Sequence, residues 1–446
     1  MWAKLPPKNM ILEMSTFIKN LKTPIAIVGM ARSGEAAKQL LLLNGVDPSL
    51  ILTFDTKLPT ANFNDPQVLM DQGKPMTLVV SPGVPLGLDW IQRAKTTGVK
   101  ITSELSLACS CLESEKIIGV TGSVGKSTTV SLIGAGLQAF SSSGFVGGNL
   151  GIPFSQYAVE VLEGKRSRAD WVVLELSSYQ LENCENLRLE FSAITYLTSN
   201  HLERYDSLED YYQTKWNILS MTAKNMFLNS GGGDLVSYSE KNASPKVRVV
   251  SKDDVLLKSL HLEEARLIGK HNQDNLALAA TIALAAGWPQ KAFDGMKNFG
   301  GLVHRLENVG NFKSIRFIND SKATAMDSVL IAAEAAHQTK EKNGRMFMLL
   351  GGRNKSLPWQ DLASLKNYSD CVFVFFGECR DLAKEKSGLP GSSYEKLGEA
   401  LDHVFKEARA GDTVLLSPGG TSWDEFKSFE DRGDFFKSRV KLFAEV

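Results

Sequence analysis

The sequence lacks any long run of uncharged apolar residues. No stretch approaches the ~18 residues that a membrane-spanning helix requires, although 43% of the residues are hydrophobic. The first twenty residues are interrupted by Pro6 and Pro7 and carry charges throughout, so they contain no apolar core of signal-peptide length. We therefore expect a globular protein with an ordinary core and no membrane span.

The sequence also lacks an excess of either charge and has few cysteines. Its 50 Lys and Arg residues balance 50 Asp and Glu residues, which gives no support for a nucleic-acid partner. The cysteine count is odd, and the spacing matches no zinc pattern. We interpret these residues as buried or incidental thiols of a protein in a reducing, cytoplasmic setting. They are Cys109, Cys111, Cys184, Cys371 and Cys379.

Short apolar runs alternate with helical patterns along nearly the whole chain, which is typical of parallel α/β units. We predict strands at 25–29, 51–55, 77–83, 116–120, 171–177, 193–199, 315–320, 345–352, 371–378 and 412–420. Helices are predicted at 34–45, closed by Asn44-Gly45, and at 272–287. The turn-rich segment 229–246 is interpreted as loops with an edge hairpin.

The predicted strands fall into three blocks, and the length of the chain agrees with this division. At ~150 residues per domain, 446 residues allow about three domains. We place the joins near Leu112 and Gly301. The expected organisation is therefore an α/β protein with domains at 1–112, 113–301 and 302–446.

The segment GVTGSVGKSTTVSL, which begins at Gly119, has the features of a phosphate-binding loop between a strand and a helix. The general motif places a glycine five positions before Gly125, where this chain has Val120. Backbone N–H groups of such a turn bind phosphate at the helix N-terminus. Lys126 would reach the outer phosphates, and Ser127 would hold Mg²⁺. The alternative is a glycine turn before an ordinary helix.

A second turn of this kind, GMARSG at 29–34, follows the first predicted strand, and Asp55 ends the next one. The pattern is similar to a dinucleotide fingerprint. However, Ala31 replaces the second glycine, and its side chain would crowd a pyrophosphate. We therefore favour another nucleotide over NAD at this turn, with a purely structural turn as the third interpretation.

Three further groups of polar residues lie at places where ligands bind in α/β proteins. Glu175 ends a strand, so it is either a Mg²⁺ ligand or a solvated strand end. His201 and Lys215 lie in a loop and a helix start, where surface and capping roles are common. The third group suits contact with a nucleotide or polar contact between domains. It comprises His304, Arg305, Asn319, Asp320 and Lys322.

Taken in order, these motifs resemble those of the Mur ligase family, ATP-dependent amide-forming enzymes of peptidoglycan synthesis. The family loop is Thr-Gly-x-x-Gly-Lys-Ser/Thr, which residues 121–127 match, so the missing glycine is the family's usual variant. Further matches are ELSSYQLE, NHLERY with Lys215 downstream, GKHNQDN at 269–275, GLVHR and NDSKAT. Together they span nearly the whole chain.

Within the family, the chain is similar to the members that add D-glutamate. This likeness rests on the short first domain, on SPGVP at 81–85 and on LSPGGTSWDEFKSFEDRGDFF at 416–436. The resemblance implies a Rossmann-like N-terminal domain that binds UDP-N-acetylmuramoyl-L-alanine (UDP-MurNAc-L-Ala). It implies a central P-loop ATPase-type domain that binds ATP and two Mg²⁺ ions, and a Rossmann-like C-terminal domain that binds D-glutamate. The product would serve cell-wall synthesis, and with it cell shape and division, and we expect a cytoplasmic monomer.

The resemblance also implies the residues of each site. Those for the UDP-substrate are Gly29, Ala31, Arg32, Ser33, Asp55, Thr56, Lys57, Ser81, Pro82, Gly83 and Asn149. Those for ATP are Gly122, Gly125, Lys126, Ser127, Thr128, Asn272, Asn275, Arg305 and Asp320. Those for D-glutamate are His201, Thr324, Lys355, Ser422 and Phe429. The catalytic residues are Lys126, Glu175, His201 and Lys215, and the metal ligands are Ser127, Glu175, His201 and Lys215, the last as a carbamate.

The last block departs from the family pattern at three places. Ala325 replaces the usual Asn after NDSKAT, GGT at 419–421 replaces a run that contains cysteine, and Arg353-Asn354 stand where Asp-Gly is common. These departures concern the geometry of the D-glutamate site rather than the reaction. The alternatives are a relative that uses another amino acid, such as a meso-diaminopimelate or folylpolyglutamate ligase, and a non-catalytic P-loop binding protein.

Overall fold

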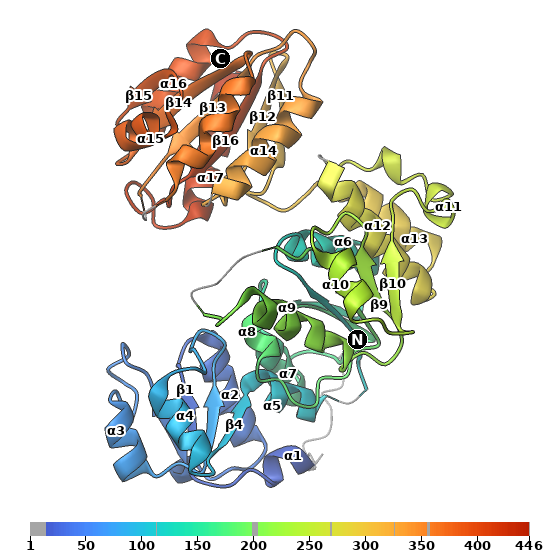
Figure 1. The fold of residues 1–446 in the computed structure, drawn as a ribbon, viewed down its shortest axis with the longest axis vertical. Coiled ribbons are helices and arrows are strands. Elements are labelled where there is room, and N and C mark those ends of the chain that lie inside the picture. Colours follow the sequence, from blue (N-terminus) through green and yellow to red (C-terminus); the bar gives the residue numbers. More distant parts are fainter. Residues whose placement is uncertain are drawn as a thin grey trace, which may run out of the picture. The chain divides into compact units, whose positions relative to one another are not determined.

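The computed structural model describes residues 15–112, 114–198, 204–267, 270–324, 326–354 and 357–445. The chain divides into two compact units, one made of Met1–Leu262 with Asp274–Met296 and the other of Glu263–Gln273 with Lys297–Val446. The first unit holds a four-stranded and a six-stranded sheet, and the second holds another six-stranded sheet (Figure 1). The predicted α/β class, spread over three sheets, is confirmed, whereas the exact domain joins stay predictions.

The first sheet has four parallel strands in the order β2-β1-β3-β4. Its strands are β1 (Ile25–Val28), β2 (Ile51–Phe54), β3 (Thr77–Val80) and β4 (Lys100–Ser103). Its helices are α1 (Thr16–Lys19), α2 (Arg32–Leu43), α3 (Pro66–Val68), α4 (Asp89–Thr96) and α5 (Glu104–Cys111). Because β2 and β3 lie on opposite sides of β1, the carboxyl ends of β1 and β3 form the switch point at which such sheets bind ligands.

The local sequence explains how the turn after β1 is held. All four side chains of β1 are buried, which fits a parallel strand covered on both faces. Helix α2 ends as predicted, because Asn44 caps it and Gly45 adopts φ 78°, a left-handed conformation that glycine takes readily. The turn at 29–31 therefore lies between a fixed strand and a well-terminated helix.

The second sheet has six parallel strands in the order β10-β9-β8-β5-β7-β6. Its strands are β5 (Lys116–Thr121), β6 (Gly144–Gly148), β7 (Trp171–Glu175), β8 (Phe191–Ile194), β9 (Met226–Asn229) and β10 (Val247–Val250). The helices are α6 (Lys126–Phe140), α7 (Phe154–Leu162), α8 (Ser178–Leu181), α9 (Leu208–Trp216), α10 (Leu235–Lys241), α11 (Val255–Lys258), α12 (Lys270–Ala285) and α13 (Gln290–Asn298). β5 lies between β7 and β8, so the turn after β5 is at the centre of the carboxyl edge.

Two details of the second sheet differ from the sequence prediction. The edge hairpin expected within 229–246 is wrong, because β10 runs parallel to β9, with Val247 opposite Met226. A parallel neighbour needs a crossover, and α10 supplies it from residues that read as turn-forming in the sequence. The strand predicted at 193–199 instead covers Phe191–Ile194.

The sheet of the second unit has the order β11-β12-β16-β13-β14-β15, with β11 antiparallel and the others parallel. Its strands are β11 (Glu307–Phe312), β12 (Ile315–Asn319), β13 (Met346–Gly351), β14 (Cys371–Phe376), β15 (Gly391–Tyr394) and β16 (Thr413–Gly419). Its helices are α14 (Met326–Thr339), α15 (Arg380–Ser387), α16 (Leu397–Glu407) and α17 (Phe429–Glu445). One hydrophobic core packs α14 and α15 against one face, and another packs α16 and α17 against the other.

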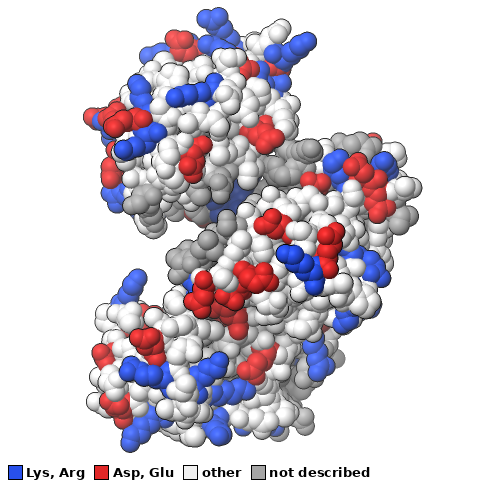
Figure 2. All heavy atoms as spheres, viewed as in Figure 1, with Lys and Arg blue, Asp and Glu red and all other residues white. Residues whose placement is uncertain are grey.

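The surface carries the mixed charge that the composition predicts. Blue Lys and Arg side chains and red Asp and Glu side chains are interspersed on the visible face of each unit (Figure 2). Among the described residues, no helix combines the length and the apolar character needed to cross a membrane.

Candidate functional site

The turn after β5 has the geometry of a phosphate-binding loop. Gly122 (φ 147°) and Gly125 (φ 85°) adopt backbone conformations that side chains disfavour, and Gly125 immediately precedes α6. Lys126 folds over the loop, and its Nζ donates to the carbonyl oxygens of Gly122 (2.8 Å) and Ser123 (3.1 Å). Ser127 lies buried in the first turn of α6. The loop thus presents an ammonium, a hydroxyl and a helix N-terminus at one place.

Gly122 is required in this loop for steric reasons. A Cβ atom there would lie 2.1 Å from Thr195 Oγ1 and 3.1 Å from the Thr195 nitrogen. We expect Gly122→Ala to destabilise the protein by about 1–3 kcal/mol through its backbone conformation, to which steric overlap adds, and to weaken ATP binding. The matched control is Gly151→Ala, which also has a positive φ (69°) but open space around it. Denaturant unfolding and nucleotide titration of both variants test this. Equal losses in the two would contradict it.

Glu175 lies at the end of β7, next to the phosphate loop, and is only 3% exposed. Its Oε1 accepts a hydrogen bond from Asn149 Nδ2 (2.7 Å), and the Asn149 backbone N–H donates to the Glu175 carbonyl oxygen (2.9 Å). Among the described residues, Glu175 Oε2 is buried and has no hydrogen-bond partner. Thr121 Oγ1, at the end of β5, is buried in the same unpartnered way. Such oxygens are costly unless a ligand completes their coordination.

Lys215, on α9, is 2% exposed, and its Nζ lies 4.7 Å from the centre of the Tyr211 ring. Burial lowers the pKa of Lys215 well below its ordinary value, the Lys126 ammonium lowers it further, and Glu175 opposes both. The structure thus brings together Lys126, Glu175 and Lys215, three residues predicted from separate motifs. His201, the fourth predicted catalytic residue, lies outside the described residues.

This group fits Mg²⁺ better than a transition metal. Within the described ranges there is no cluster of three or more His, Cys, Asp or Glu side chains that could hold a metal by themselves. The unpartnered oxygen of Glu175 and the hydroxyl of Ser127 are hard oxygen ligands, and Mg²⁺ is usually held by one or two such groups together with substrate phosphates.

The remaining predicted ATP residues are split between the two units. In the first unit, Thr129 Oγ1 lies 3.3 Å from Asn275 Oδ1, which is also the atom nearest to a Cβ built at Gly125 (2.8 Å). This places Asn275 against the phosphate loop. Thr128 lies next to Thr129 at the start of α6. Asn272, one turn earlier on α12, falls in the second unit and is buried.

Asp320 is another predicted ATP residue of the second unit. It follows β12, is 7% exposed and accepts hydrogen bonds from the Leu306 backbone N–H (3.1 Å) and from Ser417 Oγ (2.9 Å). Burial raises the pKa of Asp320 to about 7, against these hydrogen bonds and the charge of Arg305. A carboxyl of this kind exchanges a proton near neutral pH and can bind a hydroxyl-bearing ligand as donor or acceptor.

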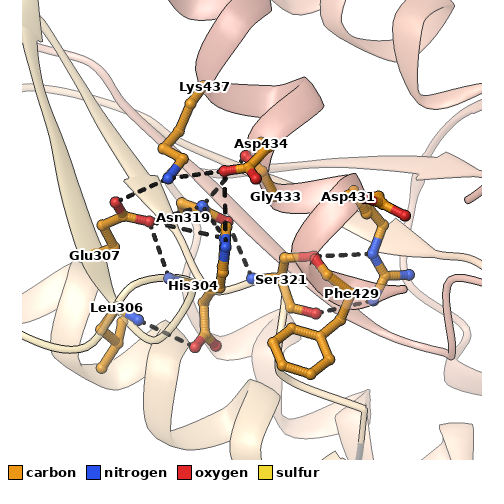
Figure 3. Close-up of polar contacts among 12 residues, drawn as sticks. His304, Leu306, Glu307, Asn319, Ser321, Phe429, Asp431, Gly433, Asp434 and Lys437 are labelled. Atoms are coloured by element: carbon orange, nitrogen blue, oxygen red, sulfur yellow. Dashed lines mark hydrogen bonds and ion pairs between the residues drawn. The ribbon is translucent and has the colours of Figure 1, made fainter. Parts of the chain in front are cut away.

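His304 anchors a buried polar network beside Asp320 (Figure 3). Its Nδ1 lies 3.0 Å from Asn319 Nδ2, which also lies 2.9 Å from Glu307 Oε2. Lys437 pairs with Glu307 (3.3 Å) and with Asp434 (3.0 Å), which closes the network on α17. Burial and the Lys437 ammonium lower the pKa of His304, so the neutral ring is favoured. The network holds the backbone of 304–307 rather than exposing His304 as a ligand.

The first-unit turn at 29–34 forms a second candidate site at the switch point of its sheet. Gly29 has φ 89°, and its carbonyl oxygen accepts a hydrogen bond from Ser81 Oγ (2.8 Å), which links the ends of β1 and β3. A Cβ at Gly34 would lie 2.0 Å from that same carbonyl, so the third glycine of the motif is needed for close packing. Ala31 and Arg32 are exposed at the start of α2, with Ser33 partly buried beside them.

Asp55 organises this turn. It accepts hydrogen bonds from the backbone N–H groups of Met30 (2.9 Å) and Lys57 (2.8 Å), and these bonds lower its pKa. The carboxylate therefore binds the turn itself, while Thr56 and Lys57 are exposed beside it. Pro82 and Gly83 continue the loop after β3.

The predicted D-glutamate residues gather at the carboxyl edge of the third sheet. Ser422 is buried after β16, and Thr324 is exposed after β12. The Phe429 carbonyl accepts from Ser321 Oγ (2.8 Å), which ties the start of α17 to the NDSKAT loop. Lys355 and Ala325 lie outside the described residues.

Two departures from the family pattern have local explanations. Arg353 pairs with Glu378 (2.8 Å) and forms a backbone bridge with Thr421, so it joins two loops of this edge. Asn354 Oδ1 accepts from the Leu357 N–H (3.1 Å) and from Trp359 Nε1 (3.2 Å). Both residues therefore serve loop structure.

Arg432 was not predicted from the sequence, although it organises this edge. Its guanidinium is fully buried and donates to Ser321 Oγ (3.0 Å), the Ser321 carbonyl (2.9 Å) and the Gly420 carbonyl (3.1 Å from both Nη atoms). It therefore holds together the two loops that carry Thr324 and Ser422. Arg432 lies within the 416–436 segment that is similar to D-glutamate ligases, but an arginine in an amphipathic helix resembles a surface residue, so no role was assigned to it.

Comparisons with known proteins identify the family of the chain. The model for the Mur ligase middle domain matches residues 120–283, and the model described as Mur ligase, glutamate ligase domain, matches residues 304–420. UDP-N-acetylmuramoylalanine--D-glutamate ligase from Myxococcus xanthus is 33% identical, and the match covers 94% of this chain and 98% of that protein. This chain belongs to the Mur ligase family. The ligase of the same name from Pasteurella multocida is 32% identical, over 96% of this chain and 100% of its own.

Two solved structures show the same fold. UDP-N-acetylmuramate-alanine ligase from Thermotoga maritima has a TM-score of 0.56 at 17% identity, covering 94% of this chain and 100% of its own. FolC from E. coli, solved with DHPP and ADP, has a TM-score of 0.56 at 16% identity, covering 81% of this chain and 99% of its own. At these identities the likeness establishes the fold and leaves the choice of substrate to other observations.

Proposed function

We propose that this Mur ligase uses ATP to join D-glutamate to UDP-MurNAc-L-Ala. The observation that carries the proposal is the grouping of Lys126, Glu175 and Lys215 beside a phosphate-binding loop, in a chain matched over nearly its whole length by D-glutamate ligases. The unpartnered carboxylate oxygen of Glu175 fits a site for the Mg²⁺ that accompanies ATP.

The reaction has two steps. A carboxylate oxygen of UDP-MurNAc-L-Ala attacks the γ-phosphorus of ATP, and the bond to ADP breaks. The acyl phosphate so formed is attacked at its carbonyl carbon by the amine of D-glutamate. Phosphate leaves, the amine nitrogen loses a proton, and an amide remains. The protein contributes mainly position and charge, as is usual for phosphoryl transfer.

Residues of the first unit serve the first step. Backbone N–H groups of the loop and the Lys126 ammonium bind the outer phosphates, and Gly122 and Gly125 allow the loop to approach them. Asn275, with Asn272 and Thr128 nearby, lines the nucleotide side. Asn149 orients Glu175 and contacts the sugar nucleotide.

The proposed site holds one or two Mg²⁺ ions. Its ligands are Ser127, Glu175, His201 and Lys215, the last as a carbamate. When bound, Mg²⁺ supplies positive charge that offsets the charge of the phosphates. The unpartnered Oε2 of Glu175 and the buried Ser127 hydroxyl support this assignment.

The two other substrates bind at the remaining sheet edges. UDP binds at the edge of the first sheet, through backbone N–H groups and the N-terminus of α2. The residues that bind it are Gly29, Ala31, Arg32 and Ser33 of the turn, Asp55 to Lys57, and Ser81 to Gly83. Thr324, Ser422 and the region of Phe429 bind D-glutamate, together with Lys355 and His201, while Arg305 and Asp320 contact ATP. We further propose that the enzyme works as a cytoplasmic monomer in the cell-wall synthesis on which cell shape and division depend.

Phosphate release tests the proposed function directly. The purified chain, ATP, Mg²⁺ and UDP-MurNAc-L-Ala should release phosphate only when D-glutamate is added, and the amide product should appear by mass spectrometry. The control reactions replace D-glutamate by L-glutamate, meso-diaminopimelate, L-alanine or a folate with L-glutamate. Phosphate release that depends on one of these compounds instead would assign another specificity. If none of the compounds causes phosphate release, only a nucleotide-binding role would remain. Size-exclusion chromatography with light scattering tests the monomer.

A further inference from the structure

Arg204 forms a buried ion pair just before α9. Its Nε and Nη2 donate to the two carboxylate oxygens of Glu182 at 3.1 and 2.7 Å, which is the paired geometry of a strong arginine–carboxylate contact. The two side chains are only 9% and 14% exposed. The guanidinium also lies 3.8 Å from the centre of the Tyr179 ring. Tyr179 lies on α8 and Glu182 is its C-cap, so both partners belong to the segment after β7 of the second sheet.

The same guanidinium also reaches the loop after β3, on the first sheet. Its Nη1 donates to the Pro82 carbonyl (3.2 Å) and its Nη2 to the Val84 carbonyl (3.4 Å). Arginine can do this because its planar group has five donors, whereas a lysine ammonium is a compact charge with three. We call the set of Arg204, Glu182 and the carbonyls of Pro82 and Val84 the Arg204 clamp.

Contacts continue from the Arg204 clamp to the phosphate loop. Tyr205 donates its hydroxyl to Glu182 Oε1 (2.6 Å), and its ring lies 5.2 Å from the Tyr211 ring. The Tyr211 hydroxyl in turn lies 3.1 Å from Ser123 Oγ. An unbroken series of packed side chains therefore joins the loop at 81–84 to the ATP loop.

The Arg204 clamp also borders a narrow crevice between the first and second sheets. Its lining includes Ser81, Pro82, Gln180, Asn183 and Arg204. Within the described residues, Asn183 Nδ2 is buried and has no hydrogen-bond partner. The crevice has a volume of about 10 Å³, which is room for a single water molecule and not for a nucleotide, so it is a packed junction of the two sheets.

We propose that Arg204 is a positioning residue for the sugar-nucleotide substrate. By fixing the loop at 81–84 against α8 and α9, it sets the distance between the UDP site and the phosphate loop, so that the substrate carboxylate arrives in line with ATP. Arg204 acts through the backbone of this loop, and it touches neither nucleotide. This inference rests on the proposed function, because it assigns to that reaction the residue that sets its geometry.

A structural ion pair between the two sheets would look similar, and the chain contains one for comparison. Lys100 of β4 pairs with Glu185 at 3.2 Å, and both side chains are about two-fifths exposed (40% and 42%). This pair also joins the first sheet to the segment after α8, but among the described residues neither of its side chains forms a hydrogen bond with the loop at 81–84. Lys100→Gln is therefore the matched control for a general loss of cohesion between the sheets.

The decisive variant is Arg204→Lys, which keeps the charge and can pair with Glu182 but cannot also serve both carbonyls. We expect the Kd and the KM for UDP-MurNAc-L-Ala to rise about 10-fold or more, since small misplacements are costly in positioned reactions. The Kd for ATP measured without the other substrates, and the KM for D-glutamate, should stay at the parent values. Glu182→Gln, which keeps the shape but removes the charge pair, should shift in the same direction by less.

Calorimetric binding and steady-state kinetics on the full chain give the answer, with thermal unfolding as the check on folding. Unchanged UDP-substrate affinity in Arg204→Lys, or equal losses for all three substrates, would overturn the inference, and so would the same shift in Lys100→Gln. If Arg204→Lys does not fold, Glu182→Gln decides by the same criteria. A parent chain that neither binds UDP-MurNAc-L-Ala nor turns over would refute the proposed function itself. A parent that does both, with unaffected variants, would refute only the role of Arg204.

Discussion

Replacing Lys126 by alanine is expected to abolish ATP-dependent ligation while the first unit stays folded. The ammonium is the side-chain cation of the phosphate loop, and within the fold it makes hydrogen bonds to the carbonyl oxygens of Gly122 and Ser123. The cost in folding free energy should therefore be about 1 kcal/mol. The loss in turnover should be about 100-fold or more, as found when one preorganised charge-stabilising group is removed.

This expectation is checked by measuring product formation and ATP binding for Lys126→Ala and for a control variant at another lysine. Lys165→Ala removes an exposed lysine of the same unit that, in the part of the chain that the structure describes, forms an ion pair with Glu163, so it should leave both quantities unchanged. The substrate set should be complete in both assays, since the acyl phosphate requires the carboxylate and ATP together. Near-parent ligation by Lys126→Ala would remove the phosphate-loop assignment.

The sequence predicted those parts of the fold that depend on a local pattern of apolar residues and glycine turns. β1 and β5 are continuous apolar or β-branched runs followed by glycine turns, and both are strands with a ligand-type turn after them. β6, with the sequence GFVGG, was not predicted because glycine has a low strand propensity. It forms because it packs beside β7, where Gly148 must lie close to the Glu175 backbone: a Cβ there would be 2.4 Å from the Glu175 carbonyl oxygen.

The candidate site was predictable where chemistry is local and unpredictable where it depends on packing. Lys126 and Ser127 follow from one short motif, and the structure gives them the expected loop. By contrast, Arg204 and Arg432 lie within NHLERY and the 416–436 segment, yet the sequence assigned them no role, because their partners are far away in the chain. Asp55 was predicted as a ligand-binding residue, which stays a prediction; its carboxylate accepts hydrogen bonds from the Met30 N–H in the turn after β1 and from the Lys57 N–H in its own loop. The split of the predicted ATP residues between two units likewise follows from the fold, which no local pattern shows.

The second large effect concerns Lys215, where the family resemblance predicts a carbamate. A carbamate forms when a neutral amine nitrogen bonds to the carbon of CO₂ and releases one proton. Burial, followed by the charge of Lys126, lowers the pKa of Lys215 well below its ordinary value, so the neutral amine is populated at a lower pH than for an exposed lysine. The product is an anionic oxygen ligand of the kind that Mg²⁺ prefers, close to Glu175.

We therefore expect Lys215→Ala to lose about 100-fold or more of the turnover and to regain part of it when acetate or another small carboxylate is added. Parent protein kept in bicarbonate should carry the added mass of CO₂ on the peptide that contains Lys215, and its activity should fall when bicarbonate is removed. Lys224→Ala is the control, because Lys224 is exposed and pairs with Glu190 away from the loop, so neither its activity nor its response to acetate should differ from the parent. Turnover of Lys215→Ala at close to the parent rate, with no carboxylate present, would show that Lys215 serves packing on α9 and has no role as a metal ligand.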